Sequence, residues 1–227
     1  MLERENERMK RYIKKGLALT LSALLCLGVL AGCGSSFSAT DLVKGNLDLI
    51  YLNQYSSEYL DSVNLTKEEA DQQYEDGIAV EVEYFCNYFE VVLDSCDDTI
   101  EPQITELYHK IYEHSKYEVG EETRNGDTYL VELTVYPIDI MQKVLEEDME
   151  AFGTQWQERT AAGEFETEEA FETAWAQGII DLVSARVDTI DYLDPQTISV
   201  QVTQGDDGLY SIDSNDFSRI DELIIAY

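Results

Sequence analysis

Cysteine is the most reactive residue type in this chain of 227 residues, and one cysteine lies in a context that predicts its chemistry. Cys33 directly follows Leu30, Ala31 and Gly32 at the end of an uncharged apolar run, and a basic stretch over residues 10–15 precedes that run. This order of basic, apolar and small residues is typical of a secretory signal rather than of a folded element. The run has about 15 residues, fewer than the roughly 20 that a membrane span needs.

The four residues from Leu30 to Cys33 resemble the lipobox of bacterial lipoproteins, in which a lipid is attached to the cysteine and the leader is cleaved just before it. The resemblance covers the first 33 residues. It implies that Leu30, Ala31 and Gly32 are recognised by the signal peptidase and that Cys33 accepts the lipid. A thiol suits this role because its thiolate is a nucleophile. Two acyl chains, such as palmitate, would make the anchor stable. The alternative is an ordinary secretory signal with an incidental cysteine.

The expected organisation is a signal peptide over residues 1–32, a lipidated cysteine with a short tether over residues 33–37, and one domain over residues 38–227. A start at Met9 would give the signal its usual compact basic region. We expect the protein at the cell membrane, held there by its lipid and facing outside the cytoplasm. The membrane is thus the first expected partner, and the sequence indicates no protein or envelope partner.

Acidic residues dominate the composition, with 47 Asp and Glu against 15 Lys and Arg and a formal charge of −32. Removing residues 1–32 takes away six basic and three acidic side chains, which leaves −35 over 195 residues. Such a field repels nucleic acid and anionic lipid headgroups, so we expect no nucleic-acid partner. Cations, basic surfaces and neutral polymers remain as possible partners. The acidity also keeps an exported domain soluble.

Two further thiols, Cys86 and Cys96, remain once Cys26 is cleaved away and Cys33 is lipidated. An oxidising exterior would permit a disulfide between them. Ten residues of continuous helix rise about 15 Å, however, and a disulfide needs α-carbons within roughly 7 Å. We therefore expect two free, largely buried thiols without a catalytic role.

Other ionisable residues form no strong motif. Four carboxylates gather at an expected helix junction: Asp94, Asp97, Asp98 and Glu101. They could bind cations weakly, as could Asp206-Asp207, but neither segment matches a calcium loop. His109 and His114 are five residues apart and diverge on a helix, and the adjacent pairs Glu146-Glu147 and Glu168-Glu169 point apart. We expect no metal site, no cofactor and no catalytic residues.

The spacing of apolar residues predicts the elements. In the first half it predicts helices over residues 38–60, 66–96 and 102–111. Thr66 and Glu69 form a capping box at the start of the long helix. Alternation over residues 129–136 predicts a strand, and Asn125-Gly126 before it predicts a hairpin with residues 117–122.

The second half repeats this order. Two helices follow, with Met141, Leu145 and Met149 expected to face the core in the first. A turn near Gly163 should bring Trp156 close to Trp175 as the helices pack antiparallel. A second hairpin over residues 198–203 and 209–213 and a short helix over residues 215–225 complete the chain. We therefore expect an α+β fold, with several amphipathic helices packed on a small antiparallel sheet made of two β-hairpins.

Two short motifs add a resemblance. The expected first hairpin ends in Tyr-Pro-Ile-Asp at 136–139, and the second reads Asp-Gly-Leu-Tyr-Ser-Ile-Asp at 207–213. Together with the lipobox and the helical first half, they resemble the small uncharacterised lipoproteins of Gram-positive Firmicutes. That family implies a location and a fold but no activity. The sequence favours a surface-anchored binding or interaction module without catalysis. The alternatives are an envelope hydrolase whose carboxylates meet only in the fold, and a structural envelope protein.

Overall fold

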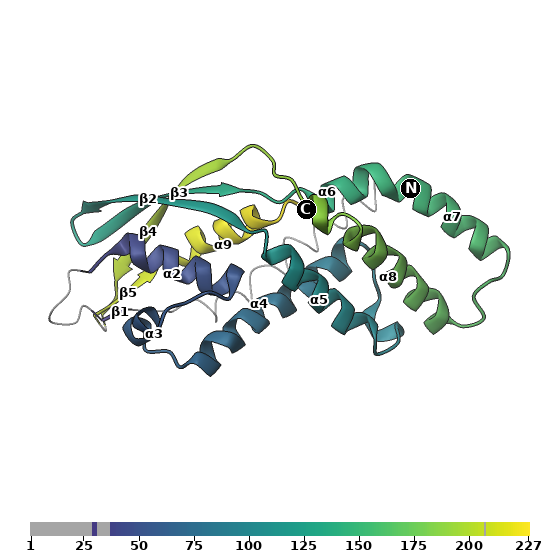
Figure 1. Ribbon diagram of the computed structural model, residues 1–227, viewed down its shortest axis with the longest axis horizontal. Coiled ribbons are helices and arrows are strands. Elements are labelled where there is room, and N and C mark those ends of the chain that lie inside the picture. The colour runs from purple at the N-terminus through teal and green to yellow at the C-terminus, as the bar shows by residue number, and fades with distance from the viewer. Residues whose placement is uncertain (1–28, 31–36, 207) are drawn as a thin grey trace.

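A five-stranded antiparallel sheet forms one end of the molecule and helices form the other (Figure 1). The computed structural model describes residues 29–30, 37–206 and 208–227. In sheet order the strands are β1 (Val29–Leu30), β5 (Leu209–Ile212), β4 (Gln196–Gln204), β3 (Thr128–Tyr136) and β2 (Lys116–Asn125). The expected α+β class is confirmed. Most of the expected signal peptide (residues 1–28), Ala31, Gly32 and Cys33, and the tether up to residue 36 lie outside the described residues, so the signal peptide and the lipidation site stay predictions.

Helices make up most of the rest of the chain. They are α2 (Ala39–Leu52), α3 (Ser57–Val63), α4 (Lys67–Tyr88), α5 (Ile100–Tyr112), α6 (Ile140–Lys143), α7 (Met149–Ala161), α8 (Glu168–Ser184) and α9 (Ser214–Ile224). Three short turns of other helix types join them: η2 (Leu93–Ser95), η3 (Val144–Asp148) and η4 (Val187–Thr189). Within the described ranges, no helix is both long and apolar enough to cross a membrane.

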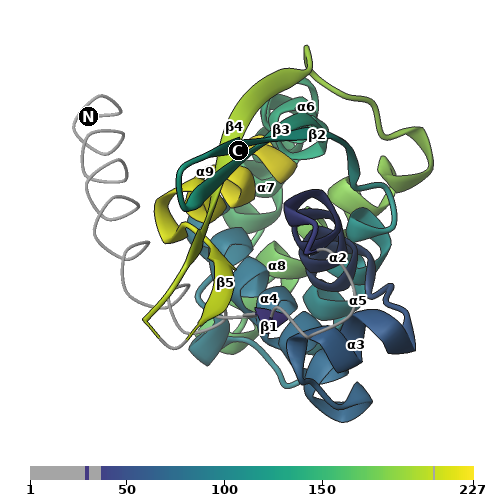
Figure 2. The same ribbon diagram turned by 90° about the vertical axis from the view of Figure 1, so that its left-hand side faces the viewer.

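The two hairpins form as predicted. Asn125 pairs with Thr128 across a two-residue turn, and Gly126 there has a φ of +66°, which glycine adopts without steric strain. Val131, Leu133 and Val135 on β3 are fully buried, so the sheet has one face on the core. Helices α2 and α9 pack against this sheet and lie between it and α4 and α5 (Figures 1 and 2).

The first helix is shorter than predicted. It ends at Leu52, because Asn53 adopts a left-handed conformation with φ of 50° and terminates it. Ser56 then accepts a hydrogen bond from the Tyr59 amide and begins a separate helix, α3. Asparagine tolerates the left-handed region and serine is a strong N-cap, so the break follows ordinary capping chemistry.

The long helix also ends earlier than predicted. Its start is right, because both bonds of the Thr66–Glu69 capping box form. Its end is Tyr88 rather than Cys96, since the chain turns at Glu90, whose φ is +56°. The argument from a continuous helix between Cys86 and Cys96 was therefore wrong, although both thiols are free. Val92, which falls within the predicted helix over residues 66–96, lies after this end and is half exposed.

The core face of the next helix differs from the one that the sequence predicts. Met141 is buried as predicted, but Leu145 is 48% exposed and Val144 is fully buried instead. Ile140 is also buried, so the core face is made by Ile140, Met141 and Val144, and Leu145 lies about a quarter turn from its centre. The π turn η3, over Val144–Asp148, changes the helical phase of the residues that follow it.

Helices α7 and α8 form the expected antiparallel pair at the end of the molecule opposite the sheet (Figure 1). The rings of Trp156 and Trp175 meet edge to face with their centroids 5.2 Å apart. Gly178 permits this approach, because a Cβ there would lie 2.4 Å from the Phe152 ring. The prediction that the two tryptophans are neighbours is confirmed.

Candidate functional site

The candidate site begins where β3 ends. Pro137 cannot continue the strand, and the next residue, Ile138, is held from two sides. Its amide donates to the carbonyl of Ile224 and its own carbonyl accepts from the amide of Ala226, both at 2.9 Å. On the other side, Ile138 bridges Tyr192. Two distant segments therefore fix the backbone directly before Asp139, the first residue of the site.

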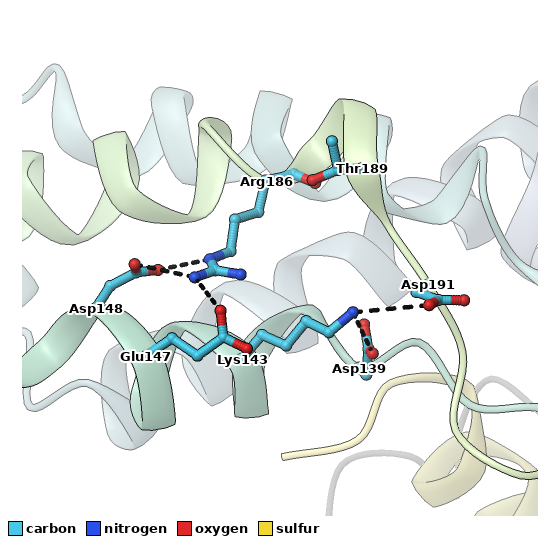
Figure 3. Close-up of polar contacts among 7 residues, drawn as sticks. All are labelled: Asp139, Lys143, Glu147, Asp148, Arg186, Thr189 and Asp191. Atoms are coloured by element: carbon cyan, nitrogen blue, oxygen red, sulfur yellow. Dashed lines mark hydrogen bonds and ion pairs between the residues drawn. The ribbon is translucent and has the colours of Figure 1, made fainter.

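Asp139 and Lys143 form the first ion pair of the site (Figure 3). They are one helical turn apart across α6, and the Lys143 Nζ lies 2.8 Å from the Asp139 Oδ2. The same Nζ lies 3.9 Å from Asp191. The hydrogen bond to Asp139 raises the pKa of Lys143 above its ordinary value, so the lysine stays charged.

Arg186, just after α8, makes the second set of pairs (Figure 3). Its Nε and Nη2 lie 2.5 and 2.9 Å from the two oxygens of Asp148, and Nη2 is also 2.8 Å from Glu147. The hydrogen bonds to Asp148 and Glu147 raise the pKa of Arg186 above its ordinary value. The forked geometry of the guanidinium contacts connects the end of α8 to η3.

A cleft of about 270 Å³ opens between these ion pairs. It is lined by Asp139, Ile140, Lys143, Glu147, Arg186, Thr189 and Ile190. Asp139 is only 6% exposed, and its Oδ1 has no hydrogen-bond partner among the described residues. Leaving a buried polar group unpaired costs about 1–3 kcal/mol and more for a charged one, so a group that donates to this oxygen would be bound favourably.

The charges around the cleft favour a cation. Two carboxylates, those of Asp139 and Glu147, line it together with the two bases Lys143 and Arg186. Two more acids, Asp148 and Asp191, contact the same bases from outside the lining. Both bases are already paired with acids, so two negative charges remain in excess. The strongly acidic chain adds a long-range field of the same sign. The cleft can therefore hold a small positively charged hydrogen-bond donor.

The acidic cluster named from the sequence has another geometry. Asp94, Asp97 and Asp98 line an open depression of about 500 Å³ with Glu168 and Glu169, which the fold brings to them from α8. Glu101 does not line it. Asp97 accepts hydrogen bonds from the amide and hydroxyl of Thr99, and these bonds lower its pKa. Its carboxylate therefore stabilises the local turn before α5. In the part of the chain that the structure describes, no group of His, Cys, Asp and Glu side chains has a metal-binding arrangement. Weak cation binding there stays a prediction.

The two histidines lie in different places, and of the two glutamate pairs only Glu168-Glu169 stays together, at the depression. His109 lies 3.1 Å from Glu75 and stacks on Tyr74, whereas His114 contributes its carbonyl to the Tyr192 hydroxyl. Of the predicted pair Glu146-Glu147, only Glu147 lines the cleft. Sequence reasoning missed Lys143 and Arg186 altogether. The scarcity of lysine and arginine in the sequence could have pointed to them, because each base in so acidic a chain has many possible acidic partners.

Comparisons with known proteins give a fold but no function. No family model matches the chain, and no curated protein matches its sequence. A solved structure, that of ycdA from Bacillus subtilis, which is described as a putative lipoprotein, is similar at a TM-score of 0.57 and 15% identity. The two chains share a fold. The match covers 84% of this chain and 56% of that one, so this chain spans little more than half of its length.

Proposed function

We propose that this chain is an extracytoplasmic lipoprotein, anchored by lipid on Cys33, whose folded domain is a non-catalytic binding module. The lipobox-like order Leu30-Ala31-Gly32-Cys33 supports the anchor. The shared fold with a Bacillus subtilis protein described as a putative lipoprotein is compatible with it. Cleavage before Cys33 would also remove β1, which pairs with β5, and leave the sheet of two hairpins that the sequence predicts.

Such an anchor would orient the domain. Four residues from Cys33 to Ser36 precede Phe37 and can span at most about 14 Å. Phe37 stacks on Tyr210 with ring centroids 3.9 Å apart and meets the edge of Tyr129, so the described chain begins against the sheet. The sheet end would therefore lie near the membrane, and the α7–α8 pair at the opposite end (Figure 1) would point away from it.

The cleft beside Asp139 is the site that we assign to the ligand, and the unpaired, buried Asp139 Oδ1 carries this assignment. The ligand is a small molecule with an ammonium or guanidinium group. Its N–H groups would donate to Asp139 and its positive charge would offset the excess of carboxylates around the cleft. An anion of the same size would meet the excess negative charge and would not bind.

The anchor is tested by expressing Cys33→Ala in a Gram-positive host fed with labelled palmitate. The wild-type protein should incorporate label and enter the detergent phase, and the variant should do neither. Cys26→Ala, which changes the other cysteine of the leader, is the matched control and should behave as wild type. Labelling of Cys33→Ala at the wild-type level would exclude this lipidation site.

The ligand class is tested by calorimetry with 1,4-diaminobutane and with succinate, a dianion of similar length. The soluble domain should bind the diamine and not succinate. Asp139→Asn should weaken diamine binding at least tenfold, which is about 1.4 kcal/mol. Glu147→Gln, at an exposed rim position, should weaken it less, and Asp206→Asn, a charge-matched change in a distant turn, should not alter it. Equal binding by Asp139→Asn and wild type would refute the site.

A further inference from the structure

The C-terminal segment that clasps Ile138 also ends in the core. Ile224 and Ala226 hold Ile138 directly before the cleft, and the next residue, Tyr227, reaches inward. Its hydroxyl donates to the Glu81 Oε2 at 2.5 Å and lies 2.7 Å from the hydroxyl of Tyr108. Residues 224–227 therefore connect the backbone at the cleft with a polar group in the core.

Glu81 is an unusual residue for its position. It lies on the apolar stripe of α4, beside Ile78, Val82 and Phe85, and is only 5% exposed. The Tyr112 hydroxyl donates to its Oε1 at 2.8 Å. Among the described residues, no lysine, arginine or histidine forms an ion pair with it. A carboxylate so placed has lost water without gaining a cation, and burial of that kind favours the neutral acid.

The ionisable groups that face Glu81 come from every element packed around it. They are Tyr84 on α4, Tyr108 and Tyr112 on α5, Tyr51 on α2, Asp221 on α9, and Tyr227. Burial, together with the charge of Asp221, raises the pKa of Glu81 to about 8, against the opposite effect of the hydrogen bonds from Tyr227 and Tyr112. Burial likewise raises the pKa of Asp221 to about 6.

We propose that residues 224–227 are a pH-operated latch on the cleft: with Glu81 protonated they stay seated and hold Ile138 and Asp139 in place, and ionisation of Glu81 releases them. The direction follows from linkage. Release of Tyr227 admits water to Glu81 and restores an ordinary acidity, so the open state binds its proton less tightly than the closed state. Raising the pH must then favour the open state.

The consequence for ligand binding rests on the function proposed above. An open latch removes the two hydrogen bonds that Ile224 and Ala226 make with Ile138, so only the contacts with residues 191–193 still hold the backbone at Asp139. Affinity for a cation should therefore fall as the pH rises through about 8. An alkylammonium group, like that of lysine, keeps its proton up to a pKa of about 10.4, so the change would come from the protein and not from the probe.

The latch is tested directly by hydrogen exchange of the peptide containing residues 222–227, corrected for the intrinsic pH dependence of exchange. Between pH 6.5 and 8.5 the protection of the wild-type segment should fall by about tenfold or more. In Glu81→Gln, which keeps the shape without the charge, protection should not change over this range. Glu83→Gln, on the exposed face of the same helix, should behave as wild type.

A second variant guards against misfolding of Glu81→Gln. Tyr227→Phe keeps the ring and loses only the hydroxyl that contacts Glu81, so its C-terminal segment should exchange faster than that of wild type even at pH 6.5. Wild-type protection that is constant with pH, or an equal fall in Glu81→Gln, would overturn the latch.

Calorimetry with 1,4-diaminobutane at the same two pH values separates the latch from the function of the cleft. Weaker binding at pH 8.5 in wild type but not in Glu81→Gln supports both. Binding that is independent of pH while exchange responds would overturn the coupling to the cleft. No diamine binding at either pH would refute the proposed ligand class, and the exchange result would still decide whether the latch exists.

Discussion

Two groups of carboxylates in this molecule are neutralised in different ways. Around the cleft, Asp139 and Asp148 each face a lysine or arginine within hydrogen-bonding distance. In the core, Glu81 and Asp221 face tyrosine hydroxyls instead. A chain with 47 acidic and 15 basic residues cannot give every acid a base. Two of its few bases pair with the acids at the cleft, and the buried acids that have no base depend on protonation.

The two groups of carboxylates should respond differently to salt and to pH. Ion pairs near the surface weaken as salt screens them and stay charged over the physiological pH range. A buried acid without a cation is insensitive to salt and sensitive to pH. The first kind of contact joins η3 to the end of α8, and the second joins α4, α5, α9 and the C-terminal segment. High salt should therefore destabilise the packing of α8 on η3, and high pH should destabilise the packing around Glu81.

The largest expected effect is the pH dependence of stability due to Glu81. Its pKa in the folded protein, about 8, is above the ordinary value of 4.5, so its contribution is complete below about pH 4.5 and is lost as the pH rises through 8. The free energy of unfolding should fall by up to a few kcal/mol between pH 5 and 9, since one pKa unit corresponds to about 1.4 kcal/mol. Urea unfolding at several pH values measures this.

Glu81→Gln should flatten that curve, and Glu83→Gln should leave it unchanged. Asp221, with a pKa raised to about 6, adds to the earlier part of the fall. If Glu81→Gln lost stability with rising pH as steeply as wild type, the buried acids would not differ from the paired ones in the way described.

A smaller effect is expected from the cleft. Arg186 is 22% exposed and bonds two acids from η3, so Arg186→Gln should lower the free energy of unfolding by about 1–2 kcal/mol after allowance for screening. Arg159, which bonds Glu164 at the tip of α7 and is 38% exposed, is the matched control. Arg159→Gln should cost less than about 1 kcal/mol.

The loss in Arg186→Gln should shrink in 1 M salt, where screening reduces the original ion pairs. Denaturant titrations with and without salt measure this difference. A loss in Arg159→Gln as large as that in Arg186→Gln would mean that the fork to Asp148 and Glu147 adds nothing to an ordinary surface pair.

The smallest effect concerns the thiols. Burial raises the pKa of the Cys86 thiol to about 12, and burial raises that of Cys96 as well. Because Cys96 lies in the acidic depression beside α8, it should react with a neutral alkylating reagent before Cys86 does, which mass spectrometry of timed samples can follow. Faster alkylation of Cys86 would contradict this order. The sequence predicts that both thiols are largely buried, whereas in the structure both are of intermediate burial.

Local signals predicted most of the elements, and their failures have physical causes. The Thr66–Glu69 box and the Asn125-Gly126 turn act within a few residues, so the sequence alone was enough to place them. The end of α4 was missed because Glu90, neither glycine nor asparagine, adopts the left-handed region. The exposure of Leu145 was missed because the buried face is made by Ile140, Met141 and Val144, whereas the predicted stripe joined Met141 to Leu145.

The candidate site could be predicted only in part. Arg186 and Asp148 are 38 residues apart and meet through the packing of α8 on η3, which no spacing rule reveals. Glu81 was accessible to sequence reasoning, since a glutamate between Ile78 and Phe85 interrupts the apolar stripe of α4. What could not be foreseen is that its partners are tyrosines from α5 and from the C-terminal segment.

The most direct test of this account is the titration of Glu81 itself. Carbon-13 NMR of side-chain carboxyls, with Glu81→Gln to assign the resonance, gives the protonation of that one group in the folded domain. The account predicts a midpoint near pH 8, with the C-terminal segment changing its shifts over the same range. A midpoint between pH 4 and 5 would show that Glu81 is ionised in the closed structure, and both the comparison and the latch would be wrong.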